Sequence, residues 1–298
     1  MLASRSSLLL QQRVRNMAGL AYSVARKMGG RLAKGGGKSA EIIPFSYDPV
    51  KQFWHDWGAN DNLVDNLGTP TLAVIRERIR KNGAEDLCQP NKAQQFLKTL
   101  DGGGHGNLQT NRVMGIGSAP NDVGFAPFSS GRRPKVTNGG NGWYFAGVIK
   151  PETGDIWLME ISRAVSSAAS RGQCYVTSSR NLMLKGNTTD NATVNAIGNT
   201  SSQITFGNKI GIEYLWEFVT DTMYIKIGSV VQAIVAGSET GPWSAFPATD
   251  PMQWIFGNQS TLGKSFNGTI YQTIFHDGVP TPEIQASVSA YVTAKAAA

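Results

Sequence analysis

From about residue 42 onward, apolar and polar side chains alternate in short runs that are separated by turn residues. The clearest run covers residues 211–228, where the alternation is interrupted at Thr220-Asp221-Thr222 and its apolar positions are Ile212, Tyr214, Trp216, Phe218, Met223, Ile225 and Ile227. A period of two puts every second side chain on the same face of a strand. The segment therefore predicts a β-hairpin with one strongly apolar face.

Further short runs with strand character follow one another along the body of the chain: Trp143–Ile149, Asp155–Ile161, Gln173–Thr177, Gln203–Phe206, Met252–Phe256 and Thr269–Phe275. The segments between them are rich in Gly, Asn, Ser and Thr, which favour turns and loops. Many short strands at this spacing are typical of an all-β, antiparallel sandwich or jelly roll.

Two helices are predicted within the body. Thr69–Arg80 is partly amphipathic, with Leu72, Ile75 and Ile79 on one side. Near the chain end, Thr281 is a natural N-cap, and Pro282 suits the first helical position. The apolar stripe of this short C-terminal helix is Ile284, Val288, Tyr291 and Val292.

The first 40 residues form a separate arm. Its apolar residues succeed one another at spacings of four and three, which predicts one stripe along a helix: Leu10, Val14, Met17, Ala21, Val24 and Met28. Glycines at 29, 30 and 35–37 end the helix and provide a flexible link. We therefore expect a partly helical arm over residues 1–40 and one sandwich domain over residues 41–298.

Charge is divided unevenly between these two parts. The arm holds eight of the 28 basic residues and no acid, which leaves the other residues with 20 bases against 21 acids, a net charge of −1. The candidate partner-binding residues of the arm are Arg13, Arg15, Arg26, Lys27 and Arg31. An anchor that docks onto a partner, a targeting presequence, a solvated tail and a nucleic-acid-binding segment all fit this composition.

Few residues suit a metal or redox centre. The two cysteines, Cys88 and Cys174, are too few for a disulfide scaffold, and we expect free thiols. The three histidines are isolated, so loop or capping roles are expected for His55, His105 and His276 and no metal-binding or cofactor residue is assigned. Calcium is a candidate ligand at Asn60, Asp61 and Asp65, which would lie in a loop. No apolar run approaches the roughly 18 residues of a membrane span.

Several motifs resemble those of the concanavalin A-like, laminin-G-like jelly roll found in bacteriophage structural proteins. The closing motifs are residues 254–258 (Trp-Ile-Phe-Gly-Asn), 266–270 (Phe-Asn-Gly-Thr-Ile), 276–278 (His-Asp-Gly) and 281–284 (Thr-Pro-Glu-Ile). Tyr224 and Gly228 fill places in the family's central hairpin, and the opening matches at Asn82-Gly83, Asp86 and Gln89-Pro90. The resemblance spans about residues 42–298. It implies a fold and leaves the activity open.

The carboxylates do not form a glycosidase pair. Asp155 and Glu160 are five residues apart on a predicted strand and face opposite sides. Glu213 and Glu217 share a face but lie about 13 Å apart on a strand, which is too far for a retaining pair. We interpret Glu213 and Glu217 as solvated acids on the outer face, and we expect no catalytic residues and no enzyme.

These observations lead to two functional hypotheses. The first is a non-enzymatic structural protein of a virus particle, of the tailed-phage capsid or tail, which is assembled in the host cytoplasm. Its arm would bind other virion proteins, in a multi-copy assembly or oligomer. The alternative is a carbohydrate-binding adhesin or receptor-binding protein that recognises a host surface glycan. The candidate glycan contact is Trp243, in a Gly-Pro-Trp loop.

Overall fold

A computed structural model of the chain gives its architecture. The contacts divide the chain into Met1–Ile42 and Ile43–Ala298. The structure describes residues of the second unit only: 43–58, 63–65, 71–75, 77–79, 86–88, 92–107, 109, 112, 114–116, 142–163, 170–187, 194–200, 202–217, 220, 222–232, 234–236, 252–258 and 264–298. The predicted arm and its basic residues, Arg13, Arg15, Arg26, Lys27 and Arg31, lie outside the described residues.

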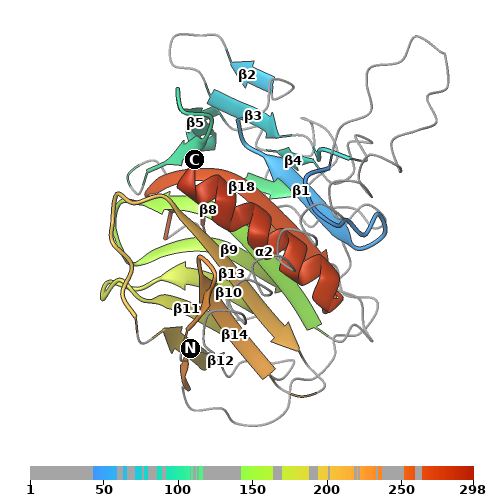
Figure 1. Cartoon of the computed structure of the whole chain (residues 1–298). Helices are drawn as coiled ribbons and strands as arrows, with labels where there is room; N and C mark the ends of the chain where they lie inside the picture. Colours follow the sequence, from blue (N-terminus) through green and yellow to red (C-terminus); the bar gives the residue numbers. More distant parts are fainter. Residues whose placement is uncertain are drawn as a thin grey trace, which may run out of the picture. The chain divides into compact units, whose positions relative to one another are not determined.

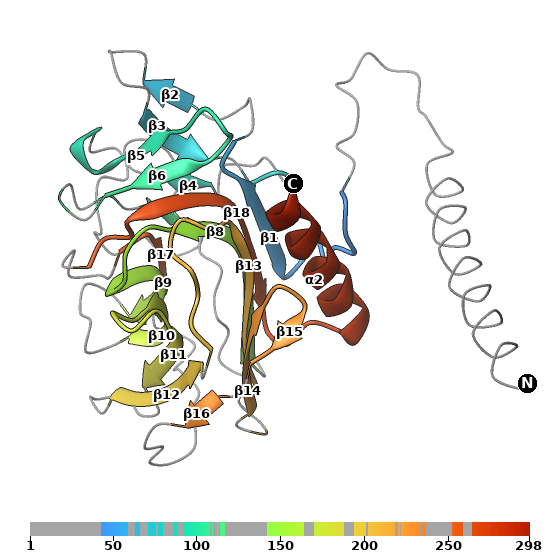
Figure 2. The ribbon, with the colours of Figure 1, turned by 60° about the vertical axis from the view of Figure 1, so that its left-hand side comes forward.

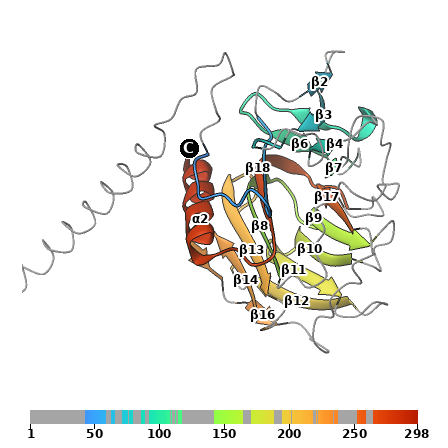
Figure 3. The ribbon, with the colours of Figure 1, turned by 90° about the vertical axis from the view of Figure 1, so that its right-hand side faces the viewer.

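Two antiparallel sheets make up most of the described fold. The first runs in the order β1 (Gln52–Asp56), β18 (Gly268–Asp277), β8 (Gly142–Pro151), β13 (Ile210–Glu217), β14 (Thr222–Ile227) and β15 (Val230–Val231). The second runs in the order β17 (Met252–Phe256), β9 (Ile156–Arg163), β10 (Ser170–Val176), β11 (Leu182–Asn187), β12 (Val194–Thr200) and β16 (Ile234–Ala236). Figure 3 shows the two layers edge-on.

A group of short strands bridges the two sheets at one edge (Figures 1 and 2). It contains β2 (Leu63–Asp65), β3 (Thr71–Ile75), β4 (Leu87–Cys88), the 3-10 helix η1 (Lys92–Gln94), β5 (Phe96–Lys98), β6 (Gly104–Gly106) and β7 (Met114–Ile116). From β3, pairing continues through β5 and β6 to β18 of the first sheet. It also continues through β4 and β7 to β17 of the second sheet.

The first sheet buries apolar side chains on both faces. In β8, Trp143 and Phe145 belong to the core between the sheets, whereas Tyr144 and Ala146 belong to a second core on the opposite face. That opposite face is covered by the helix α2 (Pro282–Ala297), which contributes Val288, Tyr291 and Val292. The helix in Figure 3 lies along the outside of this sheet. An antiparallel jelly-roll sandwich with a C-terminal helix is therefore confirmed.

The predicted start of α2 is also confirmed. Thr281 has extended backbone angles, and its hydroxyl accepts a hydrogen bond from the backbone N–H of Ile284. Pro282 occupies the first turn, where a missing N–H costs nothing, and Glu283 faces the positive end of the helix dipole.

Two predicted elements are wrong. Residues 71–75, within the predicted helix Thr69–Arg80, form strand β3, which pairs with β2 on one edge and with β4 and β5 on the other. Leu72 and Ile75 are both fully buried in this strand, which has neighbours on both sides. Their spacing of three residues therefore resembles the apolar stripe of a helix although the segment is a strand. The predicted strand Gln203–Phe206 is instead irregular backbone that ends in a turn at residues 206–207; Ile204 is buried, and its N–H donates to the carbonyl oxygen of Arg180.

Several polar residues lie elsewhere than expected. Glu213 is fully buried between β13 and α2, where Tyr144 donates a hydrogen bond of 2.8 Å to its Oε2 and Lys226 Nζ lies 3.5 Å away. The solvated position expected for Glu213 is therefore wrong, because the outer face of this strand is covered by the helix. The histidines occupy strands rather than loops: His55 is in β1, His105 in β6 and His276 in β18.

Candidate functional site

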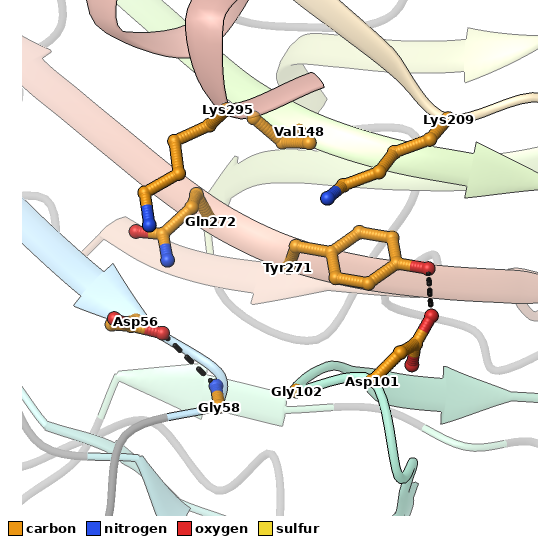
Figure 4. Close-up of a pocket in the computed structure, with 9 residues that line it drawn as sticks. All are labelled: Asp56, Gly58, Asp101, Gly102, Val148, Lys209, Tyr271, Gln272 and Lys295. Carbon is orange, nitrogen blue, oxygen red and sulfur yellow. Dashed lines mark hydrogen bonds between the residues drawn. The ribbon is translucent and has the colours of Figure 1, made fainter. Parts of the chain in front are cut away.

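A cavity of about 230 Å³ lies beside β18, at the point where the strand that pairs with one edge of β18 changes from β6 to β1. The first part of β18 pairs with β6, and the part after residue 271 pairs with β1. At the same point the pairing of β18 with β8 skips Tyr271, which is the extra residue of a β-bulge. The bulge brings the Tyr271 side chain into the lining of the cavity instead of leaving it in the regular alternation (Figure 4).

The wall opposite β8 is formed by two turns in close contact. Gly58 follows β1, and Gly102 lies in the turn between β5 and β6 with a φ of 82°. A Cβ atom at Gly58 would lie 2.3 Å from the carbonyl oxygen of Gly102, so the two backbones approach each other more closely than any side chain permits. These turns bring Asp56 and Asp101 to the same side of the cavity (Figure 4).

Gln272 is held in one orientation. Its Oε1 accepts hydrogen bonds from Trp54 Nε1 at 2.7 Å and from the Tyr291 hydroxyl at 3.2 Å. Two donors on the same oxygen identify it as the carbonyl side of the amide, and the Nε2 group therefore points the other way, toward Asp56 and the cavity (Figure 4). The fold thus supplies a preorganised hydrogen-bond donor on a rigid strand.

Two lysines line the side of the cavity opposite the aspartates. Lys209 precedes β13, and its Nζ lies 4.6 Å from the centre of the Tyr271 ring, which is a cation–π distance. Lys295 comes from the last turn of α2 and reaches the cavity from outside (Figure 4). Within the described part of the chain, neither lysine forms an ion pair with a carboxylate.

Tyr271 links the lysine side of the cavity to the aspartate side. Its hydroxyl donates a hydrogen bond of 2.6 Å to Asp101 Oδ2, and its ring forms the cation–π contact with Lys209. This hydrogen bond lowers the pKa of Asp101, with a further contribution from Thr99, and Asp101 is therefore ionised at neutral pH. Burial, together with Asp101, raises the pKa of Tyr271, so that its hydroxyl remains a donor.

This cavity contains none of the site residues expected from the sequence. Trp243, Asn60 and Asp61 lie outside the described residues, and Asp65 lies in strand β2 rather than in a loop. Asp155 is exposed beside Lys264, whereas Glu160 is fully buried in β9 next to Gln173. Among the described residues, no group of three or more His, Cys, Asp or Glu side chains could hold a metal ion.

Cys174 is a buried free thiol, as expected, and burial raises its pKa well above the usual value. Cys88 lies in β4. In the chain segments that the structure describes, no helix combines the length and the hydropathy that crossing a bilayer requires.

Sequence reasoning missed the cavity because its lining residues come from six segments that are distant in the sequence. One local signal was present: Asp101 precedes the glycines at 102–104, and such an acid–glycine sequence marks a tight turn that can present a carboxylate. No comparable signal marks Tyr271 or Gln272, which look like ordinary strand residues.

No family model matches the chain, and no curated protein matches it. Solved structures do resemble it, at low sequence identity. Trypanosoma rangeli sialidase is 7% identical over 98% of this chain and 39% of its own, with a TM-score of 0.48. Domain 4 of AbnA, an extracellular arabinanase from Geobacillus stearothermophilus, in complex with arabinotriose, is 14% identical over 83% of this chain and 98% of its own, with a TM-score of 0.44.

A carbohydrate-binding module of a Ruminococcus gnavus sialidase, bound to sialyllactose, is 9% identical over 51% of this chain and 82% of its own, with a TM-score of 0.39. All these TM-scores lie below 0.5. These similarities therefore identify no ligand for this chain, and its function has to be inferred from the cavity itself.

Proposed function

We propose that this protein binds carbohydrate and that the cavity at the β18 bulge is its binding site. The observation that carries the proposal is the fixed amide of Gln272, whose Nε2 faces the cavity opposite Asp56 and Asp101. Amide donors and carboxylate acceptors facing each other across a cavity complement sugar hydroxyls, which both donate and accept hydrogen bonds.

The size of the cavity supports a small ligand. Its volume of about 230 Å³ lies below the roughly 300–1,000 Å³ of pockets for drug-sized molecules. One sugar ring is a ligand of suitable size, and Asp101 and Lys295 are exposed at the rim, so the remainder of a longer glycan can extend into solvent.

Binding without cleavage is the second part of the proposal. Hydrolysis of a glycosidic bond requires a general acid whose pKa is raised so that it stays protonated. The pKa of Asp101 is lowered by its hydrogen bond from Tyr271, which favours an acceptor role for this carboxylate. We therefore expect no release of reducing ends when the full chain is incubated with a glycan that it binds.

A glycan array probed with the full-length chain tests the proposal. We expect saturable binding to one class of sugar, and at least about a tenfold loss of affinity in Gln272→Glu, which retains the acceptor for Trp54 and Tyr291 but removes the donor. Lys264→Met is the matched control, because Lys264 is an exposed lysine that pairs with Asp155 away from the cavity. Absence of binding to any glycan, or binding that Gln272→Glu leaves unchanged, would contradict the proposal.

A second candidate function is particle attachment through the arm. The eight basic residues in positions 1–40, without any acid, favour docking onto an acidic partner such as another protein of a virus particle. We propose it as compatible with carbohydrate binding, because a surface-displayed sandwich could carry both roles.

A further inference from the structure

The charges around the cavity are segregated. Lys209 and Lys295 lie on one side together with the Nε2 group of Gln272, and Asp56 and Asp101 lie on the other (Figure 4). A neutral sugar would need acceptors and donors around its ring but no ammonium pair. The segregation therefore points to a ligand that is itself polarised.

The aspartate side is already partly engaged. Asp101 accepts a hydrogen bond from Tyr271, and Asp56 accepts one of 3.0 Å from the backbone N–H of Gly58. A carboxylate has two oxygens and about four lone-pair sites, so Asp101 keeps acceptor capacity for a hydroxyl group. The aspartate side is therefore satisfied by hydroxyls and does not require a cation.

The lysine side has no such compensation. Neither Lys209 nor Lys295 is paired with a described carboxylate. On the aspartate side, by contrast, Lys150 lies near enough to Asp101 to help lower the pKa of that carboxyl. Lys295 lies at the C-terminal end of α2, where a cation also stabilises the helix dipole, so its presence has a structural explanation. Lys209 lies in no helix, and within the described part of the chain only the Tyr271 ring holds it.

We infer that the ligand is a sugar that carries a carboxylate. This inference rests on the proposed carbohydrate binding and adds the class of sugar. The ligand carboxylate binds between the ammonium groups of Lys209 and Lys295, within reach of Gln272 Nε2. The sugar hydroxyls then face Asp101 and Asp56. Tyr271 acts as a positioning residue, because it holds Lys209 through its ring and Asp101 through its hydroxyl.

Isothermal titration of the full-length chain with matched sugars tests the inference. The probes are D-glucuronic acid, N-acetylneuraminic acid, the methyl ester of each, and D-glucose. We expect at least one acid to bind about tenfold or more tightly than its own ester, since a charge-assisted hydrogen bond is stronger than a neutral one. The preference should shrink as salt is raised, because salt screens an exposed ion pair. The two acids distinguish a hexuronic acid from a sialic acid as the source of the carboxylate.

Substitution of Lys209 assigns the preference to this residue. We expect Lys209→Met, which keeps the length of the side chain but not its charge, to reduce the preference for the acid over its ester, because one of the two ammonium groups at the ligand carboxylate is lost. Lys209→Arg should keep a preference for the acid. Lys264→Met, the control outside the cavity, should change neither affinity.

The outcomes separate the two levels of the proposal. If an ester or glucose binds as tightly as the acid, the inference is wrong and carbohydrate binding stands. If no sugar binds, both are wrong. If acetate competes with the sugar acid at equal affinity, the cavity recognises carboxylates rather than sugars. That result would overturn both the inference and the proposed carbohydrate binding.

Discussion

At the scale of single residues, Tyr271 has the largest number of distinct roles in the cavity. Its hydroxyl donates to Asp101, and its ring lies 4.6 Å from Lys209 Nζ. Tyr271→Phe removes the hydrogen bond alone, whereas Tyr271→Leu also removes the aromatic face. We expect Tyr271→Phe to lower the free energy of unfolding by about 1 kcal/mol, and Tyr271→Leu to lower it by about 1 kcal/mol more.

Urea unfolding of both variants measures these differences, and titration with the sugar that the wild type binds should rank the affinities as wild type, Phe and Leu in descending order. If the Leu variant bound as tightly as the Phe variant, the ring would have no part in holding Lys209.

His276 makes stability dependent on pH. It is almost fully buried in β18, its Nδ1–H donates to the carbonyl oxygen of Gly278 at 3.0 Å, and Asp48 Oδ2 lies 3.7 Å from its Nε2. Burial lowers its pKa below the usual 6.5, although the Gly278 carbonyl and Asp48 act in the opposite direction. At a pH between the folded and the unfolded pKa, His276 therefore binds a proton in the unfolded chain but stays neutral in the folded chain.

The sign of this effect follows from linkage. The stability that neutral His276 contributes is complete above pH 6.5 and is lost as pH falls from there through the folded pKa. Urea unfolding at several pH values should show wild type losing more stability than His276→Gln between pH 6.5 and about pH 5. Parallel curves for the two proteins over that range would rule out this role of His276.

The sequence predicts a residue's position well where one local rule decides it. Thr281 caps α2 because its hydroxyl accepts a hydrogen bond from the N–H of Ile284, and Trp143 and Trp216 are buried because they lie in apolar strand segments. Glu213 shows the limit of such rules. Its alternation correctly places it on the face opposite Tyr214, but only the tertiary structure puts α2 over that face and supplies Tyr144 and Lys226 as partners.

At the scale of elements, strand prediction succeeds where a run of strand-forming residues is long enough and ends at a marked turn. The hairpin β13–β14 and strands β8, β9, β10, β17 and β18 occur where alternation predicts them. Strand β3 fails because it is short and its buried residues Leu72 and Ile75 lie at a helical spacing. A segment of five residues is too short for periodicity to separate the two structures.

The contact between two turns should control both the cavity and stability. Gly58→Ala would put a Cβ atom 2.3 Å from the carbonyl oxygen of Gly102, and because this neighbour is backbone, one turn has to move. We expect a loss of about 1–3 kcal/mol in the free energy of unfolding and weaker sugar binding. Chemical denaturation and titration measure the two effects.

Gly228→Ala is the matched control for this substitution. Gly228 has a φ of 62° and no atom within 4 Å of its would-be Cβ, so alanine there costs about 1 kcal/mol of backbone strain without touching the cavity. Sugar affinity should stay at the wild-type value. If the two variants bound sugar equally well, the close approach of the turns would not shape the site.

At the scale of the whole molecule, the cavity exists only after the layers have assembled. It needs the end of β1, the turn between β5 and β6, strand β8, the segment before β13, the bulge of β18 and the last turn of α2. These segments are separated by up to about 240 positions in the sequence, and no local pattern links Asp56 to Lys295. The fold class was therefore predictable from alternation, whereas the site depended on a register shift that the sequence does not mark.

Removal of the arm tests how far the two functions are separate. The described cores draw on residues from 43 onward, and the cavity is lined by residues from 56 onward, so a chain without residues 1–40 should fold and bind sugar with unchanged affinity. The deletion removes eight basic residues and no acid, which eliminates the charge that we propose for docking onto a particle. Circular dichroism, sugar titration and incorporation into particles measure the three properties. An unfolded product would show that the body depends on the arm, and full incorporation without the arm would refute the docking role while leaving carbohydrate binding intact.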